Sequence, residues 1–148
     1  MVYTCEFEFY ESGGYIDAVP LNGLEGGTFG ADLEDAVASA IDWLSELVDD
    51  ALLNNKELPP VRYGAVPSHG GRVIALAVSR SLEDIPCMSA SDAARYLGVS
   101  PARIKQLCDA GLLDSWKSGA RRLVTKASVE ARREYAMQRA AARARASA

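Results

Sequence analysis

The stretch SASDAARYLGVSPARIKQL, residues 89–107, decides the fold of the C-terminal part of the chain. Ser89 is placed to cap a helix over residues 90–97, with Asp92 three positions later as in a capping box. Gly98 permits a left-handed turn at the end of that helix. Ser100 and the proline after it predict the start of a second helix, which ends near residue 110. The apolar positions expected to face the core are Ala93, Ala94, Leu97, Val99, Ile104 and Leu107.

Two helices joined by so short a turn form a helix-turn-helix. Downstream, residues 116–124 predict a small β-hairpin, or wing, around a Ser-Gly-Ala turn. Thr125 is placed to cap a last helix that begins near residue 127. The residues that carry a family likeness are Ser91–Ser100, Ile104, Leu107, Gly111, Leu113, Lys117, Gly119, Arg121 and Arg122. On these residues, the span 88–135 resembles the winged helix-turn-helix domains of excisionases and MerR-like regulators.

The second helix of such a motif enters the major groove of DNA, so its exposed side chains predict a DNA-reading surface. Arg103 is suited to guanine and Gln106 to adenine, whereas Lys105 is equally suited to a phosphate. Basic wing residues reach phosphates or the minor groove and add salt-dependent affinity. The predicted DNA-binding residues are Ser100, Ala102, Arg103, Lys105, Gln106, Lys117, Arg121 and Arg122.

The N-terminal half predicts a small layer of one sheet and one helix. Alternating or continuous apolar residues predict strands over residues 3–9, 15–19, about 28–29 and 73–78. Asp32 is placed to cap a helix that runs to about residue 53, with an apolar stripe for the sheet. The expected fold class is therefore α+β: a small antiparallel β-β-β-α-β sheet packed on one helix, followed by the mostly helical winged domain.

Short motifs in this half carry a second likeness. They are the strands of residues 3–9 and 14–20, Gly23, and Gly30 followed by residues 32–36. On these motifs the half resembles the N-terminal domain of HicB-type antitoxins, a degenerate and partial ribonuclease-H-like fold. The resemblance implies an antitoxin of a type II HicA/HicB-like system, which masks a small basic RNA-cleaving toxin and binds operator DNA to autoregulate transcription. The alternative is a stand-alone transcriptional regulator whose N-terminal domain dimerises or senses a small ligand.

Charge divides the chain between the same two parts. The whole chain has 16 Lys+Arg and 20 Asp+Glu, a net charge of −4. Residues 1–86 hold 15 acidic and 4 basic residues, whereas residues 87–148 hold 5 acidic and 12 basic residues. The basic half suits DNA and the acidic half suits a basic protein. The expected domains are a toxin-binding and oligomerisation domain at 1–82, a linker at 83–87, the winged domain at 88–135 and an Ala/Arg-rich tail at 136–148.

Operator symmetry and the basic tail lead to two further expectations. Operators are usually two-fold symmetric, so we expect a homodimer or a higher homo-oligomer, formed through the N-terminal sheet. The tail is either a basic arm on DNA or the solvated end of the last helix, and the residues alone favour neither.

Other patterns point away from membranes, disulfides and bound cofactors. No apolar run is long enough to span a membrane, and residues 1–9 alternate with acids unlike a signal peptide, so a cytoplasmic protein is expected. Cys5, Cys87 and Cys108 have neither disulfide nor zinc spacing. The glycines of residues 23–30 lack a nucleotide-binding pattern. We therefore expect no metal and no cofactor.

The acidic strand residues and the single histidine bear on catalysis. Glu6 and Glu8 are expected on an outward face of the first strand, which is either a solvated acidic face or a surface for a partner. Asp17 is the only strand acid between apolar neighbours. His69 lies in a Pro/Gly-rich loop and is expected to be incidental. A metal-dependent nuclease needs several acids gathered around its metal ions. The pattern therefore predicts that the protein is not an enzyme.

Overall fold

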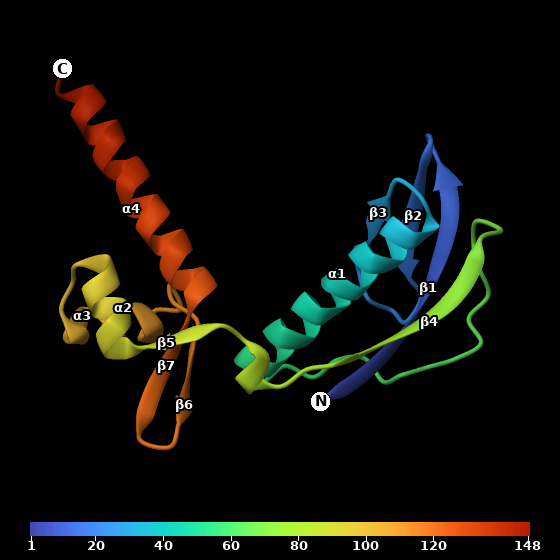
Figure 1. The fold of residues 1–148 in the computed structure, drawn as a ribbon, viewed down its shortest axis with the longest axis horizontal. Coiled ribbons are helices and arrows are strands. Elements are labelled where there is room, and N and C mark those ends of the chain that lie inside the picture. The colour runs from blue at the N-terminus through green and yellow to red at the C-terminus, as the bar shows by residue number, and fades with distance from the viewer. The chain divides into compact units, whose positions relative to one another are not determined.

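The computed structural model describes residues 1–148 and divides into two compact units, Met1–Leu82 and Glu83–Ala148 (Figure 1). Each unit has its own buried core and its own antiparallel sheet. The expected α+β class is confirmed. None of the helices combines the length and the apolar composition that crossing a membrane requires.

A four-stranded antiparallel sheet, in the order β3-β2-β1-β4, forms the N-terminal unit. Its strands are β1 (Val2–Ser12), β2 (Tyr15–Pro20), β3 (Thr28–Gly30) and β4 (Arg72–Ser79). The helix α1 (Leu33–Asn54) lies across one face of the sheet (Figure 1). β1 is longer than the pattern at residues 3–9 indicates, because it pairs with β4 at one end and with β2 at the other.

Alternate residues of β1 and one stripe of α1 make most of the core of this unit, and Ala18, Leu76 and Val78 complete it. The fully buried Phe7 ring meets the edge of Trp43, with ring centroids 5.8 Å apart. Asp32 caps α1, because its Oδ1 accepts a hydrogen bond from Asp35 N at 2.8 Å. The buried residues that β1 and α1 contribute are Tyr3, Cys5, Phe7, Phe9, Ala36, Ala40, Leu44 and Val48.

Gly30 shows why a glycine precedes the helix. A Cβ at this position would collide with the backbone of Asp35 and Ala36 in the first turn of α1. Only glycine therefore lets β3 end directly against that turn. The requirement comes from close approach between two elements, since Gly30 does not have a positive φ.

The C-terminal unit combines a three-stranded sheet, in the order β5-β7-β6, with three α-helices. Its strands are β5 (Cys87–Ser89), β6 (Ser115–Ser118) and β7 (Arg121–Thr125), and its helices are α2 (Ala90–Leu97), α3 (Pro101–Asp109) and α4 (Lys126–Ala146). β6 and β7 pair as an antiparallel hairpin. β5 adds a third strand that the sequence pattern did not predict.

The segment expected as a linker, residues 83–87, belongs to the C-terminal unit. It contains most of a 3-10 helix, η1 (Leu82–Asp84), then the buried Ile85 and the first residue of β5. The Pro86 carbonyl accepts a hydrogen bond from the backbone N–H of Lys126 at 2.9 Å. A strand of only three residues is too short to show an alternating pattern, so the sequence did not reveal this pairing.

α4 continues to Ala146, so nearly all of the tail at residues 136–148 is helical. Thr125 caps this helix, with its Oγ1 accepting a hydrogen bond from Ser128 N at 3.2 Å. Val129 is the only buried residue of α4, and every residue from Arg133 onward is exposed. Alanine and arginine both have high helix propensity, which accounts for a helix without packing along most of its length.

Candidate nucleic-acid interface

A shared apolar core and two serine caps fix α2 and α3. Ser89 Oγ accepts a hydrogen bond from Asp92 N at 3.0 Å, and Ser100 Oγ accepts one from Arg103 N at 3.1 Å. Gly98 ends α2 with a φ of 66°, in the left-handed region. The buried core of the unit consists of Ala93, Ala94, Ile104, Leu107, Leu113, Val124 and Val129. These contacts hold one side of α3 against the domain and leave its other side open to solvent.

The open side of α3 carries the residues predicted to read DNA. Ala102, Arg103, Lys105 and Gln106 are all exposed. Arg103 Nη1 donates a hydrogen bond to Gln106 Oε1 at 3.2 Å, so the two head groups lie together. Ser100 is also exposed, but its hydroxyl serves as the cap of the helix. Arg103 and Gln106 therefore form an exposed polar pair on the open side of α3.

Asp109, at the end of α3, joins this helix to the hairpin. Its carboxylate oxygens lie 2.9 Å from Lys105 Nζ and 3.7 Å from Arg122 Nη1. The hydrogen bond from Lys105, helped by the charges of Lys105, Arg122 and Lys117, holds the pKa of Asp109 below its ordinary value. Arg122 also donates to Ser115 Oγ at 3.5 Å. Lys105 and Arg122, which the sequence analysis predicts only as DNA contacts, thus also form ion pairs within the unit.

Lys117 and Arg121 are the hairpin cations without an ion pair. Both side chains are exposed, whereas the side chain of Arg122 is only 26% exposed. Lys117 and Arg122 are direct cross-strand partners and so lie on one face of the hairpin, whereas Arg121 lies on the other. Gly119 makes the turn between the strands with a φ of 61°. The hairpin therefore offers one free cation on each face.

A shallow hollow of about 510 Å³ adjoins the hairpin at the start of α2. Its lining consists of Ser89, Ala90, Ser91, Asp92, Arg95, Arg121 and Arg122. Arg95 forms an ion pair with Asp92 at 2.9 Å, with its own side chain 79% exposed. Guanidinium groups gathered in this way suit phosphate oxygens. The sequence analysis does not single out Arg95 as a basic residue of this surface, because only the fold brings it close to Arg121 and Arg122 of β7.

Comparison with known protein families identifies the type of domain that these helices and strands form. Residues 87–134 match a family model described as a helix-turn-helix domain. The C-terminal unit contains a helix-turn-helix domain. Domains of this kind bind DNA in transcriptional regulators, and α2 and α3 are the two helices of the motif. Searches of curated proteins and of solved structures gave no match to the chain.

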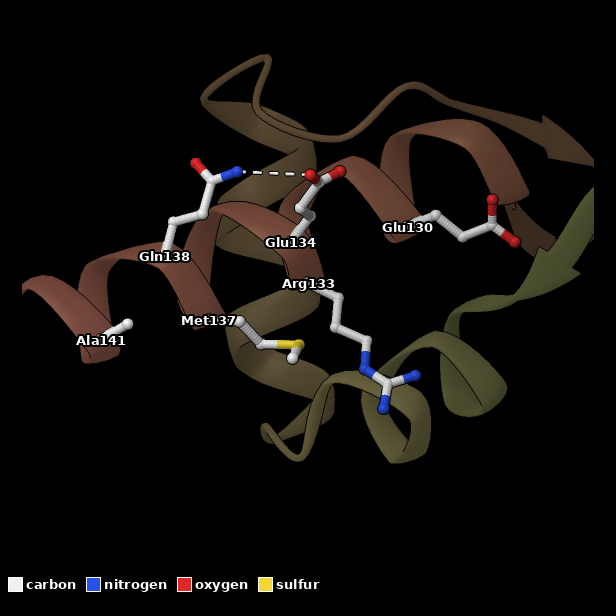
Figure 2. Close-up of a pocket in the computed structure, with 6 residues that line it drawn as sticks. All are labelled: Glu130, Arg133, Glu134, Met137, Gln138 and Ala141. Carbon is white, nitrogen blue, oxygen red and sulfur yellow. Dashed lines mark hydrogen bonds between the residues drawn. The ribbon is translucent and has the colours of Figure 1, made fainter.

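α4 follows the helix-turn-helix and contacts it near its own first turns. Arg133 lies over the ring of Tyr96 in α2, 4.8 Å from the ring centroid, and Arg132 and Arg139 lie 5.2 and 5.8 Å from the centroid of Tyr135. An open groove of about 540 Å³ runs along α4, lined by Glu130, Arg133, Glu134, Met137, Gln138 and Ala141 (Figure 2). Both charge signs line the groove, so it favours neither an anion nor a cation.

The N-terminal unit holds two buried carboxylates that the sequence placed on a solvated face. Their side chains do point away from α1, but Glu6 is 8% exposed and Glu8 only 1% exposed. Glu6 accepts hydrogen bonds from the backbone N–H groups of Gly64 and Ala65, both at 2.9 Å. The expectation of a solvated acidic face is wrong, because the connection of residues 56–71 supplies N–H donors that cover these side chains.

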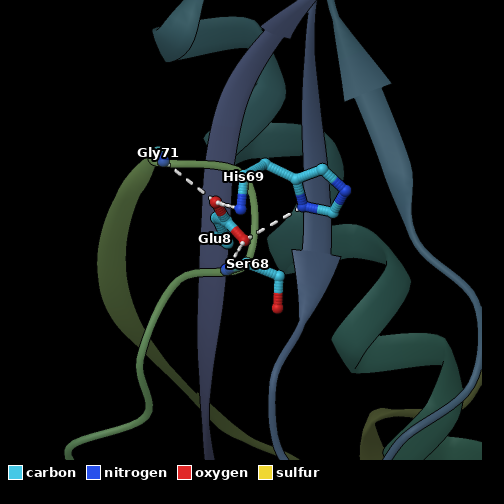
Figure 3. Close-up of polar contacts among 4 residues, drawn as sticks. All are labelled: Glu8, Ser68, His69 and Gly71. Carbon is cyan, nitrogen blue, oxygen red and sulfur yellow. Dashed lines mark hydrogen bonds and ion pairs between the residues drawn. The ribbon is translucent and has the colours of Figure 1, made fainter.

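Glu8 fixes the second half of the same connection (Figure 3). The backbone N–H groups of Ser68, His69 and Gly71 donate to its carboxylate at 2.8, 2.8 and 2.9 Å. Burial acts to raise the pKa of Glu8, but these donors hold it below its ordinary value. His69 Nδ1 lies 3.2 Å from Glu8 Oε1, and the His69 ring stacks on Tyr10 with centroids 4.0 Å apart. His69 is therefore not incidental, contrary to the sequence-based expectation.

The buried carboxylates of Glu6 and Glu8 are used to hold the chain in place. No three His, Cys, Asp or Glu side chains among residues 1–148 lie where they could hold a metal ion together. Glu6 and Glu8 accept backbone hydrogen bonds from residues 64–71 instead.

Proposed function

We propose that the protein is a transcriptional regulator that binds operator DNA with α3 in the major groove. The observation that carries this proposal is the exposed pair of Arg103 and Gln106, joined at 3.2 Å on a helix fixed by its cap and its core. Arg103 is suited to the O6 and N7 acceptors of guanine, and Gln106 to the N6 and N7 atoms of adenine. Two such side chains, one helical turn apart, read neighbouring base pairs.

The other basic residues divide into two roles in this proposal. Lys117 and Arg121 carry no internal ion pair, so they contact phosphates on either side of the hairpin. Lys105 and Arg122 first hold the hairpin to α3 through Asp109 and contact phosphates from that fixed position. Ala102 is small enough to let the start of α3 approach the DNA, and Ser100 keeps that start ordered.

The test is a gel shift and footprint on the promoter of the protein's own operon. We expect protection of two half-sites about 10 base pairs apart, the spacing of a two-fold symmetric dimer. Arg103→Ala should weaken this binding, whereas Lys126→Ala, which removes the same charge from the start of α4, should leave it nearly unchanged. Equal effects of the two substitutions would contradict the role of α3.

We further propose that the regulator is an antitoxin of a type II HicA/HicB-like system. Its N-terminal unit has a core separate from the DNA-binding unit, and residues 1–86 carry 15 acidic and 4 basic residues. That charge speeds association with a small basic protein. In this proposal the N-terminal sheet also forms the homodimer or higher oligomer that a symmetric operator requires. The alternative is a stand-alone regulator whose N-terminal unit only dimerises or senses a small ligand.

Co-expression with a small basic protein encoded beside this chain separates the two functions. An antitoxin forms a stable complex on size exclusion with light scattering, and it suppresses RNA cleavage by the partner. A stand-alone regulator elutes as a homo-oligomer and leaves the RNA cleavage unchanged.

A further inference from the structure

One face of the N-terminal sheet carries a row of side chains that the DNA-binding function does not use. Tyr10 of β1 is the direct partner of Asp17 of β2, and Asp17 is the direct partner of Phe29 of β3. Direct cross-strand partners lie on the same face of a sheet. Phe9, next to Tyr10, is buried in the core against α1, so this row lies on the opposite face.

Two ring contacts extend the row at both ends. The Tyr15 ring meets the edge of Phe29 with centroids 5.5 Å apart, and the His69 ring stacks on Tyr10 with an interplanar angle of 9°. Tyr15 is 52% exposed and Phe29 is 60% exposed. We call these five side chains, Tyr10, Tyr15, Asp17, Phe29 and His69, the aromatic row. Four aromatic rings and one carboxylate thus share a solvent-facing strip.

The fold holds the His69 end of the row in place before any partner binds. Glu8 accepts hydrogen bonds from the backbone N–H of His69 and of its neighbours Ser68 and Gly71 (Figure 3). A Cβ on Gly71 would collide with the Phe9 carbonyl, so the connection lies tightly against β1 at this point. A surface that is already ordered loses little conformational entropy on binding. The buried Glu8 therefore acts as the positioning residue for His69.

Charge identifies the kind of group that the row accepts. The face of an aromatic ring attracts a cation, and a neighbouring carboxylate adds to that attraction. Asp17 lies close enough to the phenol of Tyr10 to affect its ionisation. Burial raises the pKa of Tyr10 most, and the negative charge of Asp17 raises it further. The 15 acidic residues of residues 1–86, against 4 basic ones, repel phosphate and attract a basic protein.

We propose that the aromatic row binds arginine or lysine side chains of a basic protein, with Asp17 pairing the cation and the rings of Tyr10, Tyr15 and Phe29 covering its stem. This inference rests on the proposed protein-binding role of the N-terminal unit and names the surface that performs it. Exposed aromatic residues beside an acid lower the cost of ordering such a contact, since their side chains have few rotatable bonds.

Chemical-shift mapping on the full-length, 15N-labelled protein tests the surface directly. The probe is a capped hexapeptide of alternating arginine and glycine, and a glutamate–glycine hexapeptide serves as the negative control. We expect shifts centred on Tyr10, Asp17, Phe29 and His69 with the arginine peptide only. Asp17→Asn should lower the affinity for the arginine peptide about three- to fivefold. Asp42→Asn, which removes the same charge from the exposed surface of α1, should change the affinity less than twofold.

Three results would overturn the proposal. The first is a set of shifts spread over the acids of α1, with Asp42→Asn as damaging as Asp17→Asn. The second is an arginine peptide that shifts no residue of the row. The third is an oligouridine that shifts the row more strongly than the peptide, which would assign the rings to base stacking.

The same variants separate this inference from the antitoxin proposal. If no neighbouring basic protein forms a complex but the arginine peptide maps to the row, the antitoxin proposal fails and the surface stands. If a complex forms and the double variant Asp17→Asn with Phe29→Ala binds the basic protein as tightly as the wild type, the antitoxin proposal stands. The aromatic row is then excluded as the binding surface. A dispersed amide spectrum of each variant checks its fold, and the exposure of Phe29 makes folding of the double variant expected.

Discussion

Removing the free hairpin cations should lower the salt dependence of DNA binding without unfolding the domain. Lys117 and Arg121 are exposed and take part in no ion pair, so Lys117→Ala with Arg121→Ala breaks no internal contact of this kind. Arg122 differs, because Asp109 and Ser115 hold it at 3.7 and 3.5 Å. The double substitution therefore removes the free cations of the hairpin and leaves the ion pairs of Asp109 with Lys105 and Arg122 in place.

The expected magnitude follows from counterion release. Each phosphate contact adds about 0.9 to the slope of log affinity against log salt concentration. Two lost contacts should reduce the slope by about 1.8. Over a fourfold rise in salt, from about 50 to about 200 mM, the wild type should lose roughly 12-fold more affinity than the double variant.

Fluorescence anisotropy of a labelled promoter duplex, titrated at four salt concentrations, measures this slope. The control is the pair Arg62→Ala with Arg72→Ala, which removes the same two charges from exposed positions in the N-terminal unit. We expect the control to keep the wild-type slope within experimental error. An unchanged slope in the hairpin variant would refute the assignment of Lys117 and Arg121 to phosphates. A loss of DNA affinity confined to the cognate sequence would refute this assignment as well.

Three further outcomes are expected. Arg103→Ala should weaken binding of the cognate operator by about 1–3 kcal/mol and relax specificity at one base pair, measured by anisotropy on a set of single-base operator variants. Leu44→Ala, which empties a fully buried site in α1, should lower the free energy of unfolding of the N-terminal unit by about 2–5 kcal/mol in a urea titration, with operator affinity retained. The pKa of Glu8 is below its ordinary value, so the Glu8 carboxylate adds stability at neutral pH. This stability is lost as the pH falls through the folded-state pKa of Glu8. In Glu8→Gln, the urea concentration at the midpoint of unfolding should therefore fall less between about pH 5 and pH 3 than in the wild type. A wild-type protein whose midpoint is as flat as that of Glu8→Gln over this range would contradict the Glu8 contacts.

Several features of the fold and of the site could be predicted because neighbouring residues decide them. Ser89, Ser100 and Thr125 cap their helices by bonding an N–H three residues later, and Gly98 ends α2 with its own positive φ. Such contacts are visible in a short window of sequence. The exposed side of α3 followed in the same way from the spacing of Ile104 and Leu107.

The features that the sequence missed depend on residues far apart in the chain. Glu8 looks like a solvated strand acid until residues 68–71 fold over it and supply three N–H donors. Arg122 looks like a free wing cation until the hairpin brings it to Asp109. β5 has too few residues to show an alternating pattern, and only β7 makes it a strand.

The sequence by itself determined the α+β class, the helix-turn-helix and the change of charge sign between the two halves. Each of these rests on local capping, on periodicity or on composition, none of which needs a distant partner. The tertiary structure decided which polar side chains are free to meet a ligand and which are consumed internally. Burial makes that decision, because a carboxylate removed from water must find donors elsewhere in the chain, and the fold alone determines which donors reach it.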